Sequence, residues 1–600
     1  MAAPQLPLRR KLLYAAIVTA AAVALLFGVM EAGLRLTGYG YSPHFAHRVA
    51  SAGSETVWRE NRWCTAPYFS PALVRRPLPF RLPTRKAPGT YRIFVLGSSA
   101  AMGDPESSFS FARVLESMLH AAYPRQSIEV VNAAITATNS HLARRIASDC
   151  AALEPDLFIV YEGHNEVIGP FGPAGVFTPF LRSEPAVRLA AWTGGTRTGQ
   201  LAGAIVRRMR SGAAAPAEWG GMQMFLQQQI SADDPRLETV RDRLRANLRA
   251  IAGSARDAGA PLLLCTVLTN QRDFAPFLSR HRSNLPGADL ARWEAEFAAA
   301  IAAERAGDSV AAERSFRRAL AIDDRHAELV FRLGRLVMQA GRDAEARQLL
   351  QRALDLDALR FRTDSSLNQV IRDVAPPSPG ATLVDLAQEL AATSAHGIPG
   401  DDLLYEHVHL TFRGAYEIAN RLFPAVVAEL ARRGLASGSP QASISLAEAR
   451  QRLAFTTYEQ TMIGLKLLQR FDAAPFSAQA NAAERIELWQ RRVKTANALL
   501  GSADATETMR EIYRQALALA PNDWILARNA GAMLVARGRA AEALPLLQRA
   551  AAWIDDDVDT LLALAAAHRA LGQGAEANAA IGKARALEPR HPALPGAVPQ

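Results

Sequence analysis

Tyr91-Arg-Ile-Phe-Val-Leu-Gly-Ser-Ser-Ala-Ala-Met-Gly103 is the stretch around which the chain is organised. Residues 92–96 predict a strand that ends at Gly97, and residues 109–122 carry apolar side chains at helical spacing. In a sheet covered by helices, ligands bind outside the carboxyl ends of the strands, so a serine at this point is a candidate nucleophile. Gly and Ser are also common in ordinary turns between a strand and a helix. The stretch alone therefore leaves both possibilities open.

Short apolar runs alternate with helix-period segments after this stretch. Further strands are predicted at residues 128–132, 157–161, 261–267 and 381–386. The run at 157–161 has little alternation, as expected for a strand with both faces covered. Regular alternation of strands and helices predicts a three-layer α/β domain with a parallel sheet.

A long excursion separates the third and fourth predicted strands, at residues 169–259. It begins rich in Pro and Gly and ends in an amphipathic stretch at residues 237–258, which predicts a loop followed by a crossover helix. Because it leaves the sheet beside the candidate nucleophile, we expect it to supply substrate contacts or a lid.

The N-terminus carries an apolar run long enough to cross a bilayer. Residues 12–30 are uncharged, and Arg9, Arg10 and Lys11 precede them. A cleaved signal peptide shares this charged start, but the run is long for one and lacks a clear small-x-small cleavage site at its end. We therefore expect a single-pass anchor in a bacterial-type cytoplasmic membrane, with the bulk of the chain periplasmic or otherwise extracytoplasmic.

Composition excludes some functions and leaves others. The net charge of +10 is spread over the helices, so no nucleic-acid partner is expected. The three cysteines cannot form a complete disulfide framework. A bridge between Cys64 and Cys150 is allowed by an oxidising compartment, and Cys265 suits a buried apolar run. No Cys or His cluster has zinc-ligand spacing, so neither a metal nor a cofactor is expected.

A period of 34 residues recurs in two places. Gly307, Ala312 and Ala319 return as Gly341, Ala346 and Ala353, with Phe316 and Leu350 at the large apolar position. The C-terminal part fits the same frame at Gly531, Gly538, Ala543, Leu547, Ala550, Ala565, Gly572, Ala577, Ile581, Ala584 and Pro589. The pattern resembles the tetratricopeptide repeat, whose arrays usually bind a protein or peptide. The alternative to a repeat array is an Ala-rich helical bundle without repeats.

Three further motifs follow the nucleophile stretch in order. They are Asn132-Ala-Ala-Ile-Thr-Ala-Thr-Asn139, Glu162-Gly-His-Asn-Glu166 and Tyr405-Glu-His-Val-His-Leu-Thr-Phe-Arg-Gly414. With Gly97, Ser98, Ser99 and Gly103, they resemble the conserved blocks of the SGNH, or GDSL-type, hydrolase superfamily, across residues 91–433. The resemblance implies a three-layer, flavodoxin-like SGNH domain.

The family also assigns roles to residues of this chain. It implies Ser99 as nucleophile, His409 as base and Glu406 as the acid that orients it. It implies an oxyanion hole formed by the Ser99 N–H, the Ala137 N–H and the side chain of Asn165, which follows the motif glycine Gly163.

Some of these positions depart from the family or compete for a role. Ser98 and Ala137 stand where the family has an acidic residue and a glycine. In an extended segment His407 and His409 share a face, so orientation alone does not choose between them, whereas the family spacing selects His409. His164 is expected to be structural.

The predicted organisation follows the chain. It comprises a basic cytoplasmic tail (1–11), an anchor (12–37), a lead-in linker (38–90), the hydrolase domain (91–435) with inserted repeats (293–360), a helical connector (444–488) and C-terminal repeats (490–589).

These features favour a membrane-anchored serine esterase, acyl hydrolase or O-acyltransferase acting on an ester. Location and family together suggest an ester of a cell-surface or secreted polysaccharide. The alternative is a catalytically weak or inactive scaffold of a cell-envelope assembly, in which the repeats carry the function.

Overall fold

The computed structural model describes residues 7–50, 56–70, 73–178, 180–209, 220–435, 443–589, 591 and 593–594. Five parallel strands form the central sheet in the order β5-β4-β6-β7-β8. They are β4 (Tyr91–Gly97), β5 (Ile128–Asn132), β6 (Leu157–Tyr161), β7 (Leu262–Cys265) and β8 (Ala381–Val384). All five predicted strands are confirmed, with β7 and β8 shorter than predicted.

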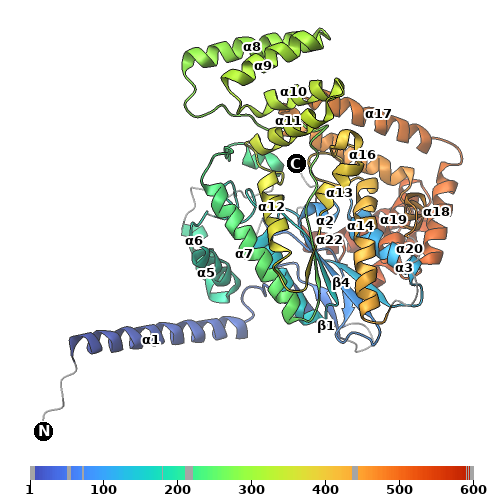
Figure 1. Cartoon of the computed structure of the whole chain (residues 1–600). Helices are drawn as coiled ribbons and strands as arrows, with labels where there is room; N and C mark the ends of the chain where they lie inside the picture. Colours follow the sequence, from blue (N-terminus) through green and yellow to red (C-terminus); the bar gives the residue numbers. More distant parts are fainter. Residues whose placement is uncertain are drawn as a thin grey trace.

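Helices cover both faces of this sheet. On one side α3 (Phe111–Ala122) packs against α14 (Phe412–Arg432), and on the other α7 (Arg236–Asp257) packs against α4 (Ser140–Cys150) and α12 (Ser365–Val374) (Figure 1). Every residue of β4, β6 and β7 is buried, which explains why these strands show no alternation in sequence. The shorter elements are α2 (Ser99–Met102), α13 (Leu386–Thr393), η2 (Ser107–Phe109), η3 (Ala151–Leu153), η4 (Gly221–Phe225), η5 (Ala395–Gly397) and η6 (Phe476–Ala478).

The strand order reverses its direction of winding beside the nucleophile stretch. From β4 the chain crosses to β5 at one edge and then passes back over β4 to β6, so its direction of winding reverses between β4 and β6. Ligands of open α/β sheets bind at such a reversal. Gly97 ends β4 where a Cβ atom would lie 2.3 Å from the carbonyl oxygen of Tyr161 on β6. A glycine is therefore required where the chain turns toward Ser99.

The segment expected as a linker contains a second, smaller sheet. Strands β1 (Ala46–Ala50), β2 (Thr56–Glu60) and β3 (Arg81–Pro83) pair antiparallel. Phe45 and Tyr68 from this segment are buried in the main core. The strands are short and rich in charged residues, so their pattern did not distinguish them from a linker.

Helix α1 (Leu8–Leu36) precedes this sheet and projects away from the body (Figure 1). None of its residues is buried, and it is long and apolar enough to cross a membrane.

The excursion between β6 and β7 is more helical than predicted. It contains α5 (Glu184–Gly195) and α6 (Arg197–Met209) ahead of α7, which is the predicted crossover helix. The two extra helices were missed because the segment before them is rich in Pro and Gly, although Ser183 and Pro185 are typical of a helix start.

The inserted repeats form two helix pairs between β7 and β8. They are α8 (Gly287–Arg305) with α9 (Ser309–Ile322), and α10 (Ala327–Gln339) with α11 (Asp343–Leu356). Their apolar residues form a core separate from the main one. Gly307 and Gly341 each follow the first helix of a pair with φ of +77°, a backbone conformation that favours glycine, so the glycine recurs once in each helix pair.

The C-terminal array repeats this design and packs against the sheet domain. Its helices are α18 (Ala505–Leu519), α19 (Trp524–Ala536), α20 (Ala540–Trp553), α21 (Val558–Ala570) and α22 (Gly574–Leu587). Arg528 on α19 donates to Ser108 Oγ at 3.0 Å, and Asp523 pairs with Arg113 on α3.

The connector consists of α15 (Leu446–Arg452), α16 (Thr457–Asp472) and α17 (Ala482–Leu500). Helix α17 runs through the predicted boundary between connector and repeats. Leu467 and Phe471 of α16 are buried in the main core. The connector is therefore part of the body that surrounds the sheet.

Candidate active site

Ser99, His409 and Glu406 lie in hydrogen-bonding contact. The distance from Ser99 Oγ to His409 Nε2 is 2.9 Å, and the Nδ1 atom of the same ring contacts Glu406 Oε1. Ser99 follows β4, whereas the other two residues lie in the loop before α14. With Nδ1–H donating to the carboxylate, Nε2 is free to accept the serine proton.

A tight loop holds Glu406 and His409 side by side. Leu404 and Leu410 form an antiparallel bridge, and the Tyr405 N–H donates to the His409 carbonyl at 2.7 Å. The Val408 N–H donates to Glu406 Oε2 at 3.2 Å, which fixes the carboxylate inside the loop. The three-residue spacing between Glu406 and His409 therefore brings the carboxylate to the imidazole across one turn of the loop.

Charges around His409 hold its pKa above the ordinary imidazole value. Burial lowers this pKa, but the negative charges of Glu406 and Asp104 outweigh burial. Burial raises the pKa of Glu406, yet His407 and His409 hold it well below its usual range. Glu406 is therefore ionised when it contacts the imidazole.

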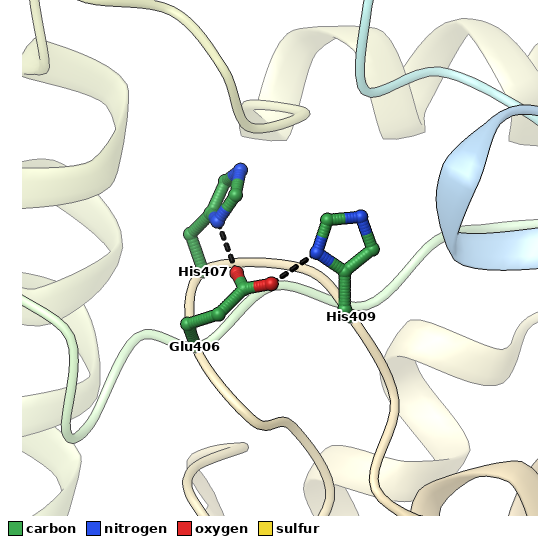
Figure 2. A group of neighbouring side chains, drawn as sticks. All are labelled: Glu406, His407 and His409. Carbon is green, nitrogen blue, oxygen red and sulfur yellow. Dashed lines mark hydrogen bonds and ion pairs between the residues drawn. The ribbon is translucent and has the colours of Figure 1, made fainter. Parts of the chain in front are cut away.

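His407 contacts the other oxygen of Glu406. Figure 2 shows His407 Nδ1 directed at Glu406 Oε2, on the opposite side of the carboxyl from His409. Its ring packs against Phe274, Phe277 and Phe476. Burial lowers the pKa of His407, so the ring is neutral at ordinary pH. Of the two histidines that sequence orientation could not separate, His409 is the one at Ser99.

The expected oxyanion-hole residues come from the two strands next to β4. Ala137 follows β5 and has a φ of +59°, the left-handed conformation that the glycine of the family pattern would adopt freely. Asn165 follows β6, and its Nδ2 donates to the Thr138 carbonyl at 2.8 Å. This bond ties Asn165 to the loop that contains Ala137 and leaves its second amide hydrogen to serve a ligand.

The remaining motif residues are buried or have little room for a larger side chain. At Gly103, with φ of +100°, a Cβ atom would lie 2.7 Å from Ser110 Cβ, and at Gly163 it would lie 3.0 Å from Thr363 Oγ1. Ser98 is buried. His164 is also buried, and its Nδ1 accepts from the Thr363 N–H at 3.4 Å.

Sequence reasoning missed Arg470, which reaches the site from α16. Its Nη1 donates to Glu406 Oε1 at 3.0 Å and lies 3.1 Å from His409 Nδ1, while Nη2 donates to Asp104 Oδ1 at 2.5 Å. Burial raises the pKa of Asp104, but Arg470 and His409 bring it below its usual value. An arginine on an amphipathic helix far along the chain carries no local signal of such a role.

Glu406, His407 and His409 also place three metal-ligand atoms within 4.8 Å of one another. This group was not predicted from the sequence, because its residues do not have the spacing of a known zinc motif. The guanidinium of Arg470 already places a positive charge beside Glu406 and His409. This positive charge disfavours a metal cation at the same place.

The cysteines lie away from this site. Cys64, Cys150 and Cys265 are buried and free in the structure. Burial raises the pKa of the Cys150 thiol well above its ordinary value, which disfavours the reactive thiolate.

Comparison with known proteins identifies the repeats. Residues 303–362 match the tetratricopeptide repeat model, from the end of α8 to shortly after α11. No curated protein matches the chain.

Solved structures give weak similarities. A MamA RS-1 ArsTM double mutant is 21% identical, covers 22% of this chain and 77% of its own, and has a TM-score of 0.15. A tetratricopeptide repeat protein from Parabacteroides merdae is 16% identical, covers 50% of this chain and 94% of its own, and has a TM-score of 0.16. The match to the repeat model points to protein–protein interaction.

Proposed function

We propose that this chain is a membrane-anchored serine enzyme of the SGNH-like type, an esterase or O-acyltransferase whose tetratricopeptide repeats bind a protein partner. The observation that carries the proposal is the 2.9 Å contact between Ser99 Oγ and His409 Nε2, with Glu406 on the other ring nitrogen. A serine hydroxyl becomes a useful nucleophile when an oriented imidazole takes its proton.

The reaction would proceed through an acyl-enzyme. Ser99 Oγ forms a bond to the ester carbonyl carbon while its proton passes to His409 Nε2. The tetrahedral intermediate collapses, the C–O bond to the alcohol breaks, and the imidazolium returns the proton to the leaving oxygen. Water or a second hydroxyl then attacks the acyl-serine with His409 again as base.

Charge on the carbonyl oxygen would be met by the Ser99 N–H, the Ala137 N–H and the Asn165 amide. Donors of this kind each lower the barrier by about 3–4 kcal/mol when they are pre-oriented. The bond from Asn165 to Thr138 supports such pre-orientation because it fixes the amide plane.

The remaining parts of the chain support the proposed location and suggest a class of substrate. Helix α1 supports an anchor, with the basic residues before it on the cytoplasmic side and the body outside. An anchored enzyme in that position would meet esters of a cell-surface or secreted polysaccharide. The inserted repeats support partner binding, since α8 and α9 project from the body (Figure 1).

The test is hydrolysis of p-nitrophenyl acetate by the full-length chain beside Ser99→Ala, with Ser309→Ala as a matched control on the exposed start of α9. We expect Ser99→Ala to lose about 10³-fold or more of the turnover and all labelling by a fluorophosphonate. Ser309→Ala should retain both. Equal rates for wild type and Ser99→Ala would refute the enzyme proposal.

A second candidate function is a scaffold in which the repeats act alone. It is favoured by the match of residues 303–362 to the tetratricopeptide repeat model. A wild-type chain that neither hydrolyses the ester nor takes the fluorophosphonate, yet forms a photo-crosslink to a partner from Val310 on α9, would establish it.

A further inference from the structure

Helices α5 and α6 form a hairpin joined to the end of α1. The carboxylate of Glu31 accepts hydrogen bonds from the backbone N–H groups of Arg197 and Thr198 at 3.1 and 2.9 Å, at the N-terminus of α6. The Tyr41 N–H donates to Gln200 Oε1 at 3.0 Å. These bonds fix the position of the hairpin relative to the proposed anchor (Figure 1).

The hairpin contacts the end of the apolar run of α1. The ring of Trp192 on α5 stacks on that of Phe27, with centroids 5.8 Å apart. Phe27 precedes Glu31 by about one helical turn and belongs to the uncharged stretch that ends at Met30. A bilayer that surrounds Phe27 therefore also meets Trp192, and tryptophan favours the membrane–water interface.

Apolar side chains line one stripe of each helix and remain exposed. Leu189 and Trp192 lie on successive turns of α5, and Ile205, Val206 and Met209 lie on the last turns of α6. Their exposed fractions range from 44% to 78%. Side chains of this size at helical spacing are normally covered.

Charge around these stripes suits a lipid surface. Residues 182–209 contain five arginines and one glutamate, and Arg207 and Arg208 border the stripe of α6. Arginine beside apolar stripes is typical of helices that lie in the headgroup region of anionic bilayers.

We propose that the α5–α6 hairpin lies in the outer interface of the bilayer, with Leu189, Trp192, Ile205, Val206 and Met209 inserted among the lipids. The inference rests on the proposed anchor, because α1 sets the depth of the hairpin. Together they hold the body in a fixed orientation on the membrane. The hairpin belongs to the excursion that leaves the sheet after β6, so the same segment joins the membrane to the candidate site.

The test uses nitroxide labels on the full-length chain in anionic nanodiscs. The native cysteines are buried and free, so Ile205→Cys and Met209→Cys can be labelled singly. Val18→Cys on α1 reports the anchor. Val310→Cys is the matched control, an apolar position that is 70% exposed on α9.

We expect the labels at positions 205 and 209 to be relaxed by oxygen and shielded from an aqueous nickel chelate, at roughly 5–10 Å below the headgroup boundary. The label at 310 should show the reverse. Nickel access at 205 and 209 with a lipid-exposed label at 18 would overturn the hairpin inference and leave the anchor intact. Nickel access at 18 as well would refute the anchor and the inference together. Labels at 205 and 209 that are shielded from both oxygen and nickel, and that show spin–spin broadening, would indicate that a second copy of the chain covers this face. That result would also overturn the inference.

Discussion

Arg470 Nη1 donates to Glu406 Oε1 at 3.0 Å although the two residues are 64 positions apart. The same guanidinium binds Asp104, which follows the nucleophile segment. One cation from the connector therefore joins the loop of the proposed nucleophile to the loop of the proposed base.

Replacement of Arg470 should change the pH dependence of the proposed reaction. The positive charge of Arg470 lowers the pKa of His409, so Arg470→Gln raises it. Because the base acts as a neutral imidazole, the acid limb of the p-nitrophenyl acetate pH–rate profile should move to higher pH. Arg470→Lys keeps the charge and should leave the limb closer to wild type. An unmoved limb in Arg470→Gln would show that Arg470 has no electrostatic effect on the base.

The two histidines of the loop should behave differently. His409→Gln should lower kcat/KM by about 10²–10⁴-fold, because the base is lost. His407→Gln should leave most of the turnover and lower the free energy of unfolding by about 0.5–3 kcal/mol, because a packed buried ring is replaced. Steady-state kinetics and urea unfolding of both variants check this. The opposite ranking in kinetics would assign the base to His407.

Asn165 should contribute to the transition state rather than to the fold. Asn165→Ala removes a proposed oxyanion donor and should lower kcat by about 10²–10³-fold. Asn368→Ala is the matched control, since Asn368 Nδ2 also donates to a backbone carbonyl, that of Val267 at 3.0 Å, outside the site. Similar kcat values for the two variants would count against the oxyanion role.

Gly531 and Leu547 should be energetically coupled in the C-terminal array. A Cβ atom at Gly531 would lie 2.5 Å from Leu547 Cγ, so Gly531→Ala should cost about 1–3 kcal/mol. Leu547→Ala alone should cost about 2–5 kcal/mol, and the double variant less than the sum, because the added methyl enters the vacated space.

Urea unfolding measures this coupling. Gly574→Ala is the control, because nothing lies within 4 Å of a Cβ atom there. Strictly additive losses would contradict the predicted contact between α19 and α20.

Sequence patterns predicted the parts of the fold that are determined by residues close together along the chain. The five strands appear in sequence because each is an apolar run between turns, and the repeats appear because Gly307, Gly341, Gly538 and Gly572 share one backbone conformation at one spacing. The small sheet before β4 was not predicted, since its strands are only three to five residues long and carry charged residues.

The candidate site was likewise predictable only in the part that lies within sequence motifs. Ser99, Glu406 and His409 belong to motifs with a recognisable order, and the structure brings their side chains together. Arg470 and Asp104 depend on how α16 packs against the sheet domain, which no local pattern encodes. Ala137 shows the limit of reasoning from motifs. Sequence alone shows that alanine replaces the glycine of the family pattern, whereas the left-handed φ of +59° explains why glycine suits this position.

The position of Arg470 has a consequence for biosynthesis. A chain grows from its N-terminus, so the ribosome completes Ser99, the inserted repeats and the loop of His409 before α16 exists. A fragment that stops after α14 would contain the serine and both histidines but lack the cation that holds Glu406 and Asp104. The charge network of the proposed site is therefore complete only after α16 has been synthesised.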